Sequence, residues 1–378
     1  MPRRVLVFAM LDWLGAARLP GGLTRAGFEV GVLCPKSSLI SLTRFVSRRA
    51  EVEGRVHVRE LGLAIHKFVT KWGAQAIIAT DDQSVRYLHD FAAQCYGKTL
   101  EPQFSEPGFL TVLDRSLPAG KHLQSLSTKS AMHSIAEAAG VSVPPVVVTK
   151  GVDDALAHAA KWGYPIVLKP DRGSAGFGVT ICRDERGLRS TYQELASHPR
   201  RPADNAILAQ VYITGQQVDY PFVANSGKVL AGLTKYKIHA HPAPLGPSSV
   251  IEIIDEPSID QSAGKVVAAL RYNSFGSVQF VIEAATKQPY FLELNPRPVP
   301  IIHAPQELVG IDWCQAWHAA IAGETPPIFN GPIVGRKVAL FPQEWYRDRN
   351  SRFLHYEAVH DVPWDDPALL QGYLNHRP

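Results

Sequence analysis

The segment Glu293-Leu294-Asn295-Pro296-Arg297 ends an apolar run with a carboxylate, an amide and a guanidinium. Side chains of an extended strand alternate between its two faces, so Glu293 and Asn295 are expected on one face. Carboxylate and amide oxygens are ligands that Mg²⁺ prefers. An edge strand with ordinary polar residues explains either residue alone, but it explains less well a polar pair that ends in Asn-Pro-Arg. The segment therefore predicts a magnesium site with an arginine just beyond it.

A strand candidate, Val278–Ile282, precedes this segment and carries Gln279. If the two strands form a hairpin, Gln279 lies opposite Glu293 and adds an amide oxygen to the predicted metal site. Glu283 is a nearby alternative for this position.

Lys169-Pro170 is followed by a glycine-rich loop, Gly173-Ser174-Ala175-Gly176-Phe177-Gly178. Glycines let the backbone approach a ligand closely, and successive N–H groups can point at one anion. Ser174 adds a hydroxyl donor and Lys169 a positive charge, which together suit a polyphosphate. For the loop alone, a plain flexible turn is an equally good interpretation. It is not a Walker A motif, because no Gly-Lys-Ser/Thr follows, and it lacks the strand–GxGxxG–helix order of a dinucleotide fold.

These residues need strands and helices to position them. Residues 1–115 alternate short apolar runs with helical patterns, which predicts an α/β domain with a parallel sheet. Its expected elements are strands at Val5–Ala9, Val30–Cys34 and Ala76–Thr80 and a helix near Ala16–Ala26. Asp81 and Asp82 directly follow a strand, where they could contact a substrate, but capping of the next helix is favoured.

The rest of the chain divides into residues 116–204, residues 205–330 and a tail, 331–378. The tail is rich in Trp, Pro, Asp and Arg, and it is expected to be ordered but not helical and to pack on its own chain. Further expected strands are Val146–Thr149, Ile166–Lys169, Val179–Cys182, Ala206–Gln210, Asp219–Ala224, Val229–Leu233 and Tyr290–Leu294. Expected helices are one capped by Ser127 or Thr128 that runs through Ala139, one from Asp153 to near Gly163, and Pro257–Leu270.

Composition excludes several classes of protein. The net charge is only +4, and no stretch concentrates Lys and Arg, so no nucleic-acid partner is expected. The four cysteines are widely spaced without a CxxC pair, which argues against a disulfide framework or a zinc site and favours a cytoplasmic location. No window approaches the ~18 apolar residues of a membrane span. Asp12 interrupts the first apolar run, which favours a buried strand over a signal peptide.

Lys169-Pro170, the Gly173–Gly178 loop and Glu293–Arg297, in this order and spacing, resemble the ATP-grasp superfamily. The closest resemblance is to the synthetase unit of the carbamoyl-phosphate synthetase large subunit, and it covers residues from about 125 to 325. The resemblance implies an α/β protein, α+β in its catalytic part, with an ATP-grasp fold. Residues 1–115 would be its preceding α/β domain, 116–204 a small subdomain with the phosphate lid, and 205–330 a large subdomain with the metal site.

The resemblance also implies roles for individual residues. Lys129 and Lys169 correspond to lysines that contact the nucleotide phosphates, and Gly173, Ser174, Ala175, Gly176 and Gly178 to the lid over them. Gln210, Val211, Tyr212 and Ile213 correspond to the hinge that holds adenine through backbone groups, and Gln217 to the ribose-binding position. Gln279, Glu293 and Asn295 correspond to metal ligands, and Arg297 to an arginine that meets the substrate or the transferring phosphoryl group.

The sequence departs from the family pattern at several of these positions. Gln210 and Gln217 stand where Glu is usual, but each still offers an acceptor oxygen. A neutral Gln279 replaces an acid, which leaves Glu293 as the main anionic ligand, so one of two Mg²⁺ ions would bind weakly. Pro298–His303 replaces the small Gly/Ser-rich stretch that borders the acceptor site in many members.

The implied reaction joins a small-molecule carboxylate to an amine through an acyl phosphate, with ATP and Mg²⁺ (or Mn²⁺) as cofactors. Arg297 and Lys169 would carry the catalytic charge stabilisation. A homodimer is the assembly considered. Phosphoryl transfer to bicarbonate or carbamate, and a non-catalytic ATP-binding module favoured by the three glutamines, are the alternatives. His239, His241 and His303 are weaker candidates for a base, and Lys235, Tyr236 and Lys237 face either the nucleotide or solvent.

Overall fold

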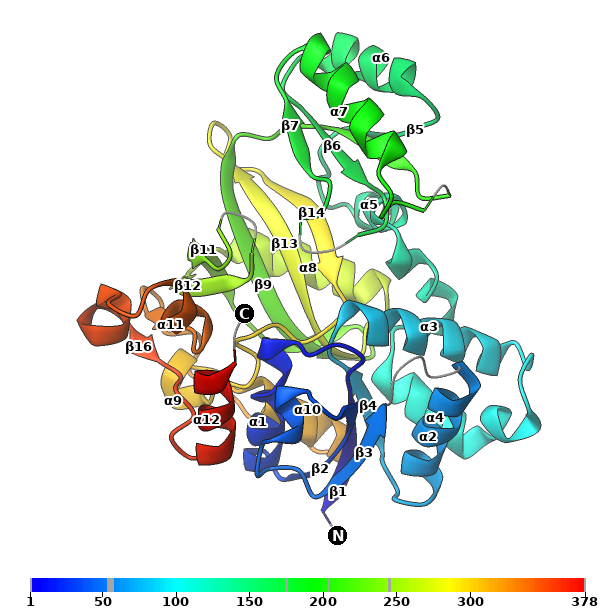
Figure 1. Ribbon diagram of the computed structural model, residues 1–378, viewed down its shortest axis with the longest axis vertical. Helices are drawn as coiled ribbons and strands as arrows, with labels where there is room; N and C mark the ends of the chain where they lie inside the picture. The colour runs from blue at the N-terminus through cyan, green and yellow to red at the C-terminus, as the bar shows by residue number, and fades with distance from the viewer. Residues whose placement is uncertain (1, 53–57, 174–175, 203, 244–245, 377–378) are drawn as a thin grey trace.

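Three β-sheets organise the chain, whose computed structural model describes residues 2–52, 58–173, 176–202, 204–243 and 246–376. In Figure 1 the first sheet lies at the bottom, a small sheet at the top, and a large sheet between them. The α/β class expected from the sequence is confirmed. Within the described ranges, no helix is long and apolar enough to cross a membrane.

The first sheet is parallel, and helices cover both of its faces. Its order is β3-β2-β1-β4, with β1 (Arg3–Phe8), β2 (Phe28–Pro35), β3 (Arg48–Val52) and β4 (Ala76–Ala79). One face packs on α1 (Leu19–Arg25) and α10 (Trp313–Ala322), and the other on α2 (Val58–Thr70), α3 (Asp82–Tyr96) and α4 (Pro107–Ser116). Val5–Phe8 is fully buried, as a strand covered on both faces requires.

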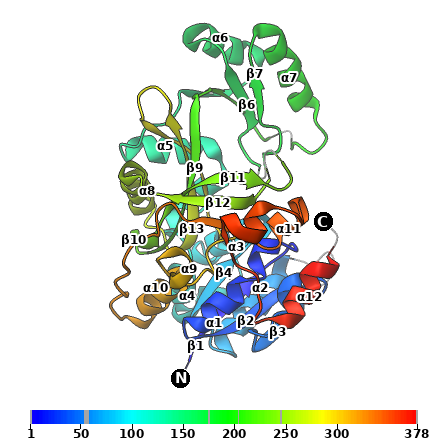
Figure 2. The same cartoon turned by 90° about the vertical axis from the view of Figure 1, so that its left-hand side faces the viewer.

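The small sheet is antiparallel and is covered on one face only. Its order is β5-β8-β6-β7, with β5 (Val146–Thr149), β6 (Ile166–Pro170), β7 (Thr180–Cys182) and β8 (Ile207–Val211). Helices α6 (Val152–Trp162) and α7 (Glu185–Ser197) bury one face. The opposite face looks toward the large sheet (Figures 1 and 2).

The large sheet follows the order β14-β13-β9-β11-β12-β15-β16, with β10 paired to β9. Its strands are β9 (Gly215–Asn225), β10 (Lys228–Gly232), β11 (Thr234–Ala240), β12 (Ser248–Ile254), β13 (Ser274–Glu283), β14 (Pro289–Asn295), β15 (Lys337–Ala339) and β16 (Val359–His360). Helices α5 (Lys129–Ala138) and α8 (Pro257–Ala269) pack on one face. The other face joins the core of the first sheet at one end, through side chains such as Val223 and Phe275.

The tail contains helices, so the expectation that it is not helical is wrong. Besides β15 and β16 it forms α11 (Gln343–Arg347), a π-helical turn (Phe353–Glu357) and α12 (Pro367–Asn375). Asp366 caps α12 by accepting a 3.4 Å hydrogen bond from the Leu369 amide, and Pro367 occupies the first turn. The Asp-Pro start of α12 was not recognised in the sequence because the surrounding prolines and tryptophans are typical of a loop. α12 lies against the first domain, where Tyr373 Oη donates a 3.0 Å hydrogen bond to the Leu14 carbonyl.

Short elements complete the chain: α9 (Gln306–Val309) and the 3-10 turns Leu14–Ala16, Leu39–Ser41, Pro102–Ser105, Gly120–His122 and Ser125–Ser127. Most strands and helices expected from the sequence are confirmed within a few residues. The helices α2, α4, α7 and α10 and the strands β3 and β12 were not expected.

Candidate active site

The hairpin β13–β14 brings the predicted metal residues together. Gln279 pairs with Glu293 and Ser277 with Asn295, so the expected register is confirmed, and Glu293 and Asn295 share a face. A register shift beside Gln279 leaves Leu292 without a cross-strand partner. The irregularity lies next to the polar pair, in keeping with the tendency of bulges to re-aim side chains at sites.

The row of paired residues continues across two more strands. Asp219 of β9 is opposite Gln279, and Lys235 of β11 is opposite Asp219. Lys235 Nζ lies 2.6 Å from Asp219 Oδ2, and Ser277 Oγ donates a hydrogen bond to the other carboxylate oxygen. Lys235 is buried, so the alternative that it faces solvent is wrong. Asp219 was missed because its partners come from strands distant in the sequence.

The neighbours of Lys235 on β11 take other partners. Tyr236 Oη donates a 2.6 Å hydrogen bond to Glu252 Oε2, and Tyr236 packs on the covered face of the sheet with α5 and α8. Lys237 Nζ donates a 2.7 Å hydrogen bond to the Gly246 carbonyl. Of the three candidates on this strand, Lys235 alone pairs with the row that contains Gln279.

Lys169 is a buried cation at the end of β6, with 7% of its surface exposed. Burial lowers its pKa to about 8, an effect that Glu293 opposes, Lys129 reinforces and Asp171 opposes. These influences show that the two lysines and Glu293 lie near one another. Among the residues that the structure describes, no side chain forms a hydrogen bond or an ion pair with the Lys169 ammonium. A buried charge without a partner is costly, so this ammonium indicates an anionic ligand.

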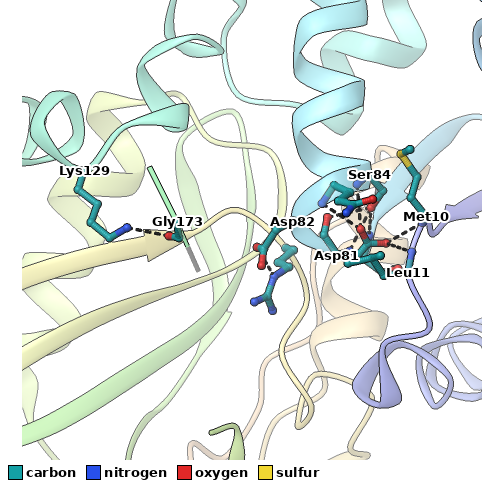
Figure 3. Close-up of polar contacts among 10 residues, drawn as sticks. Met10, Leu11, Asp81, Asp82, Ser84, Lys129 and Gly173 are labelled. Carbon is teal, nitrogen blue, oxygen red and sulfur yellow. Dashed lines mark hydrogen bonds and ion pairs between the residues drawn. The ribbon is translucent and has the colours of Figure 1, made fainter. Parts of the chain in front are cut away.

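Lys129 begins α5 and reaches the glycine-rich loop. Its Nζ donates a 2.7 Å hydrogen bond to the Gly173 carbonyl (Figure 3). Asp171 fastens the start of the same loop, because its carboxylate accepts 2.8 Å hydrogen bonds from the amide and the hydroxyl of Ser130. These hydrogen bonds join the start of the glycine-rich loop to the first turn of α5.

The described part of the loop has the backbone that glycine allows. Gly176 and Gly178 have φ of +73° and +69°, in the left-handed region. A Cβ at Gly178 would also stand 2.9 Å from Pro170 and Leu195. Ser174 and Ala175, which were predicted to contact phosphates, lie outside the described residues.

The open face of the small sheet carries a mainly apolar row with one amide. Val146, Gln210, Val167 and Ile181 are paired across β5, β8, β6 and β7. Oε1 of Gln210 is buried and has no hydrogen-bond partner in the described chain. An apolar surface with one unused acceptor is the surface that an adenine ring and its amino group require.

In the predicted adenine hinge, residues 210–213, two backbone amides already have partners within the protein. The Val211 and Tyr212 amides donate to the carbonyls of Pro145 (2.9 Å) and Pro165 (3.1 Å), so they are already used within the protein. In the described chain the Ile213 amide has no such partner. Gln217, at the ribose position, is exposed on β9 opposite Val281.

Arg297 is fixed by the first domain. Its Nε donates a 2.8 Å hydrogen bond to Asp82 Oδ1, and its guanidinium lies 5.2 Å from the centre of the Trp13 ring. The favoured capping role is confirmed for Asp81, which accepts hydrogen bonds from the amides of Gln83 and Ser84 (Figure 3). The Asp82 carboxylate pairs with Arg297.

A cavity of about 120 Å³ lies between α3, the start of α5 and the end of β14. Asp82, Arg86 and Asp90 line it from α3, and Glu293 and Asn295 line it from β14. Lys129, Asp171 and Gly173 border it on the side of the loop. Two of the predicted metal ligands, Glu293 and Asn295, thus share one opening with Lys129, Gly173 and the first domain. The predicted residues Gln279, Lys169 and Arg297 do not line it.

His303 is not in this cavity. It is buried beneath the tail, where its Nε2 lies 2.9 Å from Asp361 Oδ2. Burial, together with the nearby Arg18 charge, lowers the pKa of His303 to about 4. Its role is structural, so the idea of His303 as a base is not supported. His239 packs against Phe353 and His241 against Tyr346, also away from the cavity lining.

In the described chain, no group of three or more His, Cys, Asp or Glu side chains is placed to hold a metal ion. A cation at the β13–β14 hairpin would therefore rely on the Glu293 carboxylate together with the amide oxygens of Asn295 and Gln279. Such an oxygen-only set with a single charge suits Mg²⁺, which keeps several waters and shares substrate phosphates.

Residues 128–312 match the family described as the carbamoyl-phosphate synthase L chain, ATP binding domain. The chain is 26% identical over 288 residues to the mitochondrial methylcrotonoyl-CoA carboxylase subunit alpha of Arabidopsis thaliana, covering 72% of this chain and 36% of that protein. It is 25% identical over 223 residues to biotin carboxylase of Halalkalibacterium halodurans, covering 56% of this chain and 48% of that protein. The chain therefore spans about a third to a half of these curated relatives.

Solved structures share the fold over a larger part of the chain. Biotin carboxylase from Campylobacter jejuni superposes with a TM-score of 0.67 at 17% identity, covering 89% of this chain and 74% of that one. N5-carboxyaminoimidazole synthetase from Staphylococcus aureus, complexed with ADP, gives 0.65 at 14%, covering 89% and 82%. L-amino acid ligase from Bacillus licheniformis gives 0.59 at 15%, covering 88% and 76%.

The solved structures and the family match together show the ATP-grasp fold that the motifs predicted. Residues 128–312 resemble the ATP binding domain of the carbamoyl-phosphate synthase L chain.

Proposed function

We propose that this chain is an ATP- and Mg²⁺-dependent ligase that activates a small-molecule carboxylate as an acyl phosphate and joins it to an amine. The observation that carries the proposal is Lys169, a buried ammonium without a partner in the described chain, close to Glu293. A phosphate group would supply the missing negative charge, and Glu293 would hold the accompanying cation.

The two facing sheets fit a nucleotide between them. On the small sheet, the Gln210 Oε1 acceptor is available to the amino group of adenine, beside the apolar Val167 and Ile181. Lys169 lies further along the same strand as Val167, where the phosphates would follow. The S. aureus synthetase, which shares this fold, was solved with ADP, which supports the assignment.

Glu293 and Asn295, with Gln279 opposite, would hold Mg²⁺. The bound ion would neutralise phosphate charge and orient the transferring group.

The chain's own residues contribute position and charge. Lys129 and Lys169 hold the phosphates while a substrate carboxylate oxygen forms a bond to the γ-phosphorus, and the bond from that phosphorus to the β–γ bridging oxygen breaks to release ADP. Arg297 stabilises the charge that develops. An amine nitrogen then bonds to the acyl carbon, the carbon–oxygen bond to phosphate breaks, and the departing phosphate takes the amine proton.

A screen for ADP release across carboxylate and amine libraries tests the proposal, with mass spectrometry of the products. Lys169→Ala and Glu293→Gln should abolish substrate-dependent ADP release while circular dichroism shows an intact fold. Lys161→Ala, on the surface of α6, is the matched control and should keep full activity. Full activity in both site variants would show that the site is assigned wrongly.

A second candidate is phosphoryl transfer to bicarbonate, which the biotin carboxylases among the relatives support. ADP release with bicarbonate alone, without an amide product, would favour it. Binding of ATP, seen as a thermal shift, without ADP release from any substrate would instead favour a non-catalytic ATP-binding module.

A further inference from the structure

The strand that carries two predicted metal ligands is held at its irregular residue by a side chain from outside the sheet. β14 is an edge strand, and Leu292, between Phe291 and Glu293, has no cross-strand partner. His133 of α5 supplies a contact there, because its Nε2 lies 2.9 Å from the Leu292 carbonyl oxygen. One residue earlier, the Phe291 amide donates a 2.8 Å hydrogen bond to the Ser142 carbonyl, just after α5. The bulge beside Glu293 is therefore fixed by α5 and the segment that follows it.

The buried ring of His133 is neutral and forms a hydrogen bond on one side only. A carbonyl oxygen can only accept, so Nε2 carries the ring proton. Burial, together with the Lys169 charge, lowers the pKa of His133 to about 4, which leaves Nδ1 as a bare acceptor at neutral pH. Nδ1 is buried and has no hydrogen-bond partner in the described part of the chain.

The unpaired Nδ1 atom argues that His133 is not there for stability. A buried polar atom without a partner makes the folded state less stable. The ring packs edge-on against Phe291, with 5.8 Å between ring centres, and an apolar side chain could fill this place without that cost. A residue that breaks a packing rule in this way is expected at a functional site. The contact that His133 provides in return is the one to the bulge carbonyl of Leu292.

The same face of α5 reaches the glycine-rich loop. Lys129 and His133 are four residues apart, so their side chains lie on one face of the helix. Lys129 Nζ donates a hydrogen bond to the Gly173 carbonyl (Figure 3), and Ser130 in the same turn donates to the Asp171 carboxylate. A single helical turn therefore joins the loop assigned to the phosphates to the bulge beside the predicted metal ligands.

We propose that His133 is a positioning residue of the metal site: its Nε2–H group holds the bulge of β14 so that Glu293 and Asn295 point at one cation. Lys129, one turn earlier on the same helix, stands at the phosphates that this cation must also bind. The inference rests on the proposed function, because it requires Mg²⁺ at these two ligands. His133 touches neither the cation nor the nucleotide, and it acts through the direction of the ligand side chains, as outer partners of metal ligands do.

Calorimetry of ADP binding to the full chain tests this role without measuring turnover. The Mg²⁺ gain is the Kd for ADP in EDTA divided by the Kd for ADP in saturating Mg²⁺. In His133→Leu, ADP should bind in EDTA as it does to the wild type, but the Mg²⁺ gain should fall by about tenfold. His133→Gln keeps an N–H donor near the position of Nε2 and should retain most of the gain.

A histidine on another helix provides the matched control. Nε2 of His158 on α6 lies 3.2 Å from the Pro145 carbonyl oxygen, so His158→Leu removes a comparable contact away from β14. The Mg²⁺ gain of this variant should equal that of the wild type. The melting temperature of His133→Leu without ligand should stay equal or rise, because the unpaired Nδ1 atom is lost.

A measurement on the wild type keeps the test valid if His133→Leu does not fold. In protein labelled with ¹⁵N-histidine, the His133 resonance is assigned by its absence from the spectrum of His133→Gln. The spectrum should show the ring proton on Nε2. Mg²⁺ with ADP should shift this resonance more than ADP alone, because the cation draws on the ligands beside the bulge.

The outcomes separate this inference from the proposed function. The positioning role is wrong if His133→Leu keeps the wild-type gain, if Gln and Leu lose it equally, or if ADP shifts the resonance as much as Mg²⁺ with ADP does. Equal weakening of ADP binding with and without Mg²⁺ would show a purely structural role. If the wild type does not bind ADP, or gains nothing from Mg²⁺, the proposed function is wrong and this inference falls with it.

Discussion

Asp82 accepts a 2.8 Å hydrogen bond from Nε of Arg297, which joins the first helical turn of α3 to the residue that follows the predicted metal segment. Arg297 comes from the large sheet, and Asp82 comes from the first domain. The guanidinium that would meet the substrate is therefore oriented by a domain outside the matched region 128–312. This explains why both parts of the chain are needed to build one site.

Asp82→Asn should weaken the hold on Arg297 without removing the arginine. A charge-assisted hydrogen bond at this partly exposed position contributes about 1 kcal/mol, so KM for the carboxylate should rise about fivefold. KM for ATP should change less than twofold, because the nucleotide contacts lie elsewhere. Steady-state kinetics with each substrate varied in turn measures the two KM values separately. Gln83→Ala, on the exposed side of the same turn, should change neither constant.

Trp13→Ala should give a similar effect through the other face of Arg297, since a cation–π contact contributes about 0.5–1 kcal/mol. Trp13→Phe keeps an aromatic ring beneath the guanidinium and should retain most of the wild-type KM. Equal losses in the two variants, measured by the same kinetics, would contradict a role for the ring.

Lys169 should take up a proton when nucleotide binds. Its pKa is lowered to about 8, so at pH 8 about half of the free protein carries a neutral Lys169. A bound phosphate favours the ammonium, and calorimetry in buffers of different ionisation enthalpy should detect uptake of about half a proton at pH 8 and almost none at pH 6.5. Lys169→Arg, which stays charged, is the control and should show no such uptake. Identical uptake in both proteins would assign the proton elsewhere.

Gln210→Leu should weaken ATP binding while leaving the fold intact. The variant removes the Oε1 acceptor and keeps a side chain of similar size, and one hydrogen bond is worth about 0.5–1.5 kcal/mol, or about two- to tenfold in Kd. The melting temperature without nucleotide should stay equal or rise, because a buried acceptor without a partner is lost. Leu208→Met, a conservative change two residues earlier on the same strand, is the control. Unchanged Kd would exclude Gln210 from the adenine site.

His303 should make the protein sensitive to acid. Its pKa in the folded protein is about 4, below the value of about 6.5 expected after unfolding, so the unfolded chain binds more protons between these values. The contribution of His303 to the free energy of unfolding should therefore be fully present above pH 6.5 and should decrease as the pH drops toward 4. Urea titrations across this window measure it. His303→Asn, which cannot take up the proton, should have lower stability at neutral pH but a flatter dependence on pH.

The sequence alone predicted the features that depend on neighbouring residues. Alternation placed Glu293 and Asn295 on one face, and a short hairpin brought Gln279 opposite Glu293, because both follow from local strand geometry. The Lys235–Asp219 pair was missed because β10 intervenes between its two strands. Only the order of the strands in the sheet shows that Lys235 and Asp219 lie in the same row as Gln279.

Helix α3 was expected only as the helix that Asp81 caps, and its extent was not predicted. Charged residues such as Asp82, Arg86 and Asp90 interrupt the apolar spacing that indicates a helix. His303 was considered as a base because it follows the Glu293–Arg297 segment, and the sequence does not show that its partner is Asp361 of the tail.

The hydrogen bond from Tyr373 to the Leu14 carbonyl has a consequence for the order in which the chain is made. Leu14 follows Trp13, whose ring lies beneath Arg297, so the C-terminal helix α12 supports the loop that orients this arginine. On the ribosome, residues 128–312 emerge before α12 does. Under the proposed function, a nascent chain would bind ATP before Arg297 is oriented, and the reaction would begin only after α12 packs on the first domain.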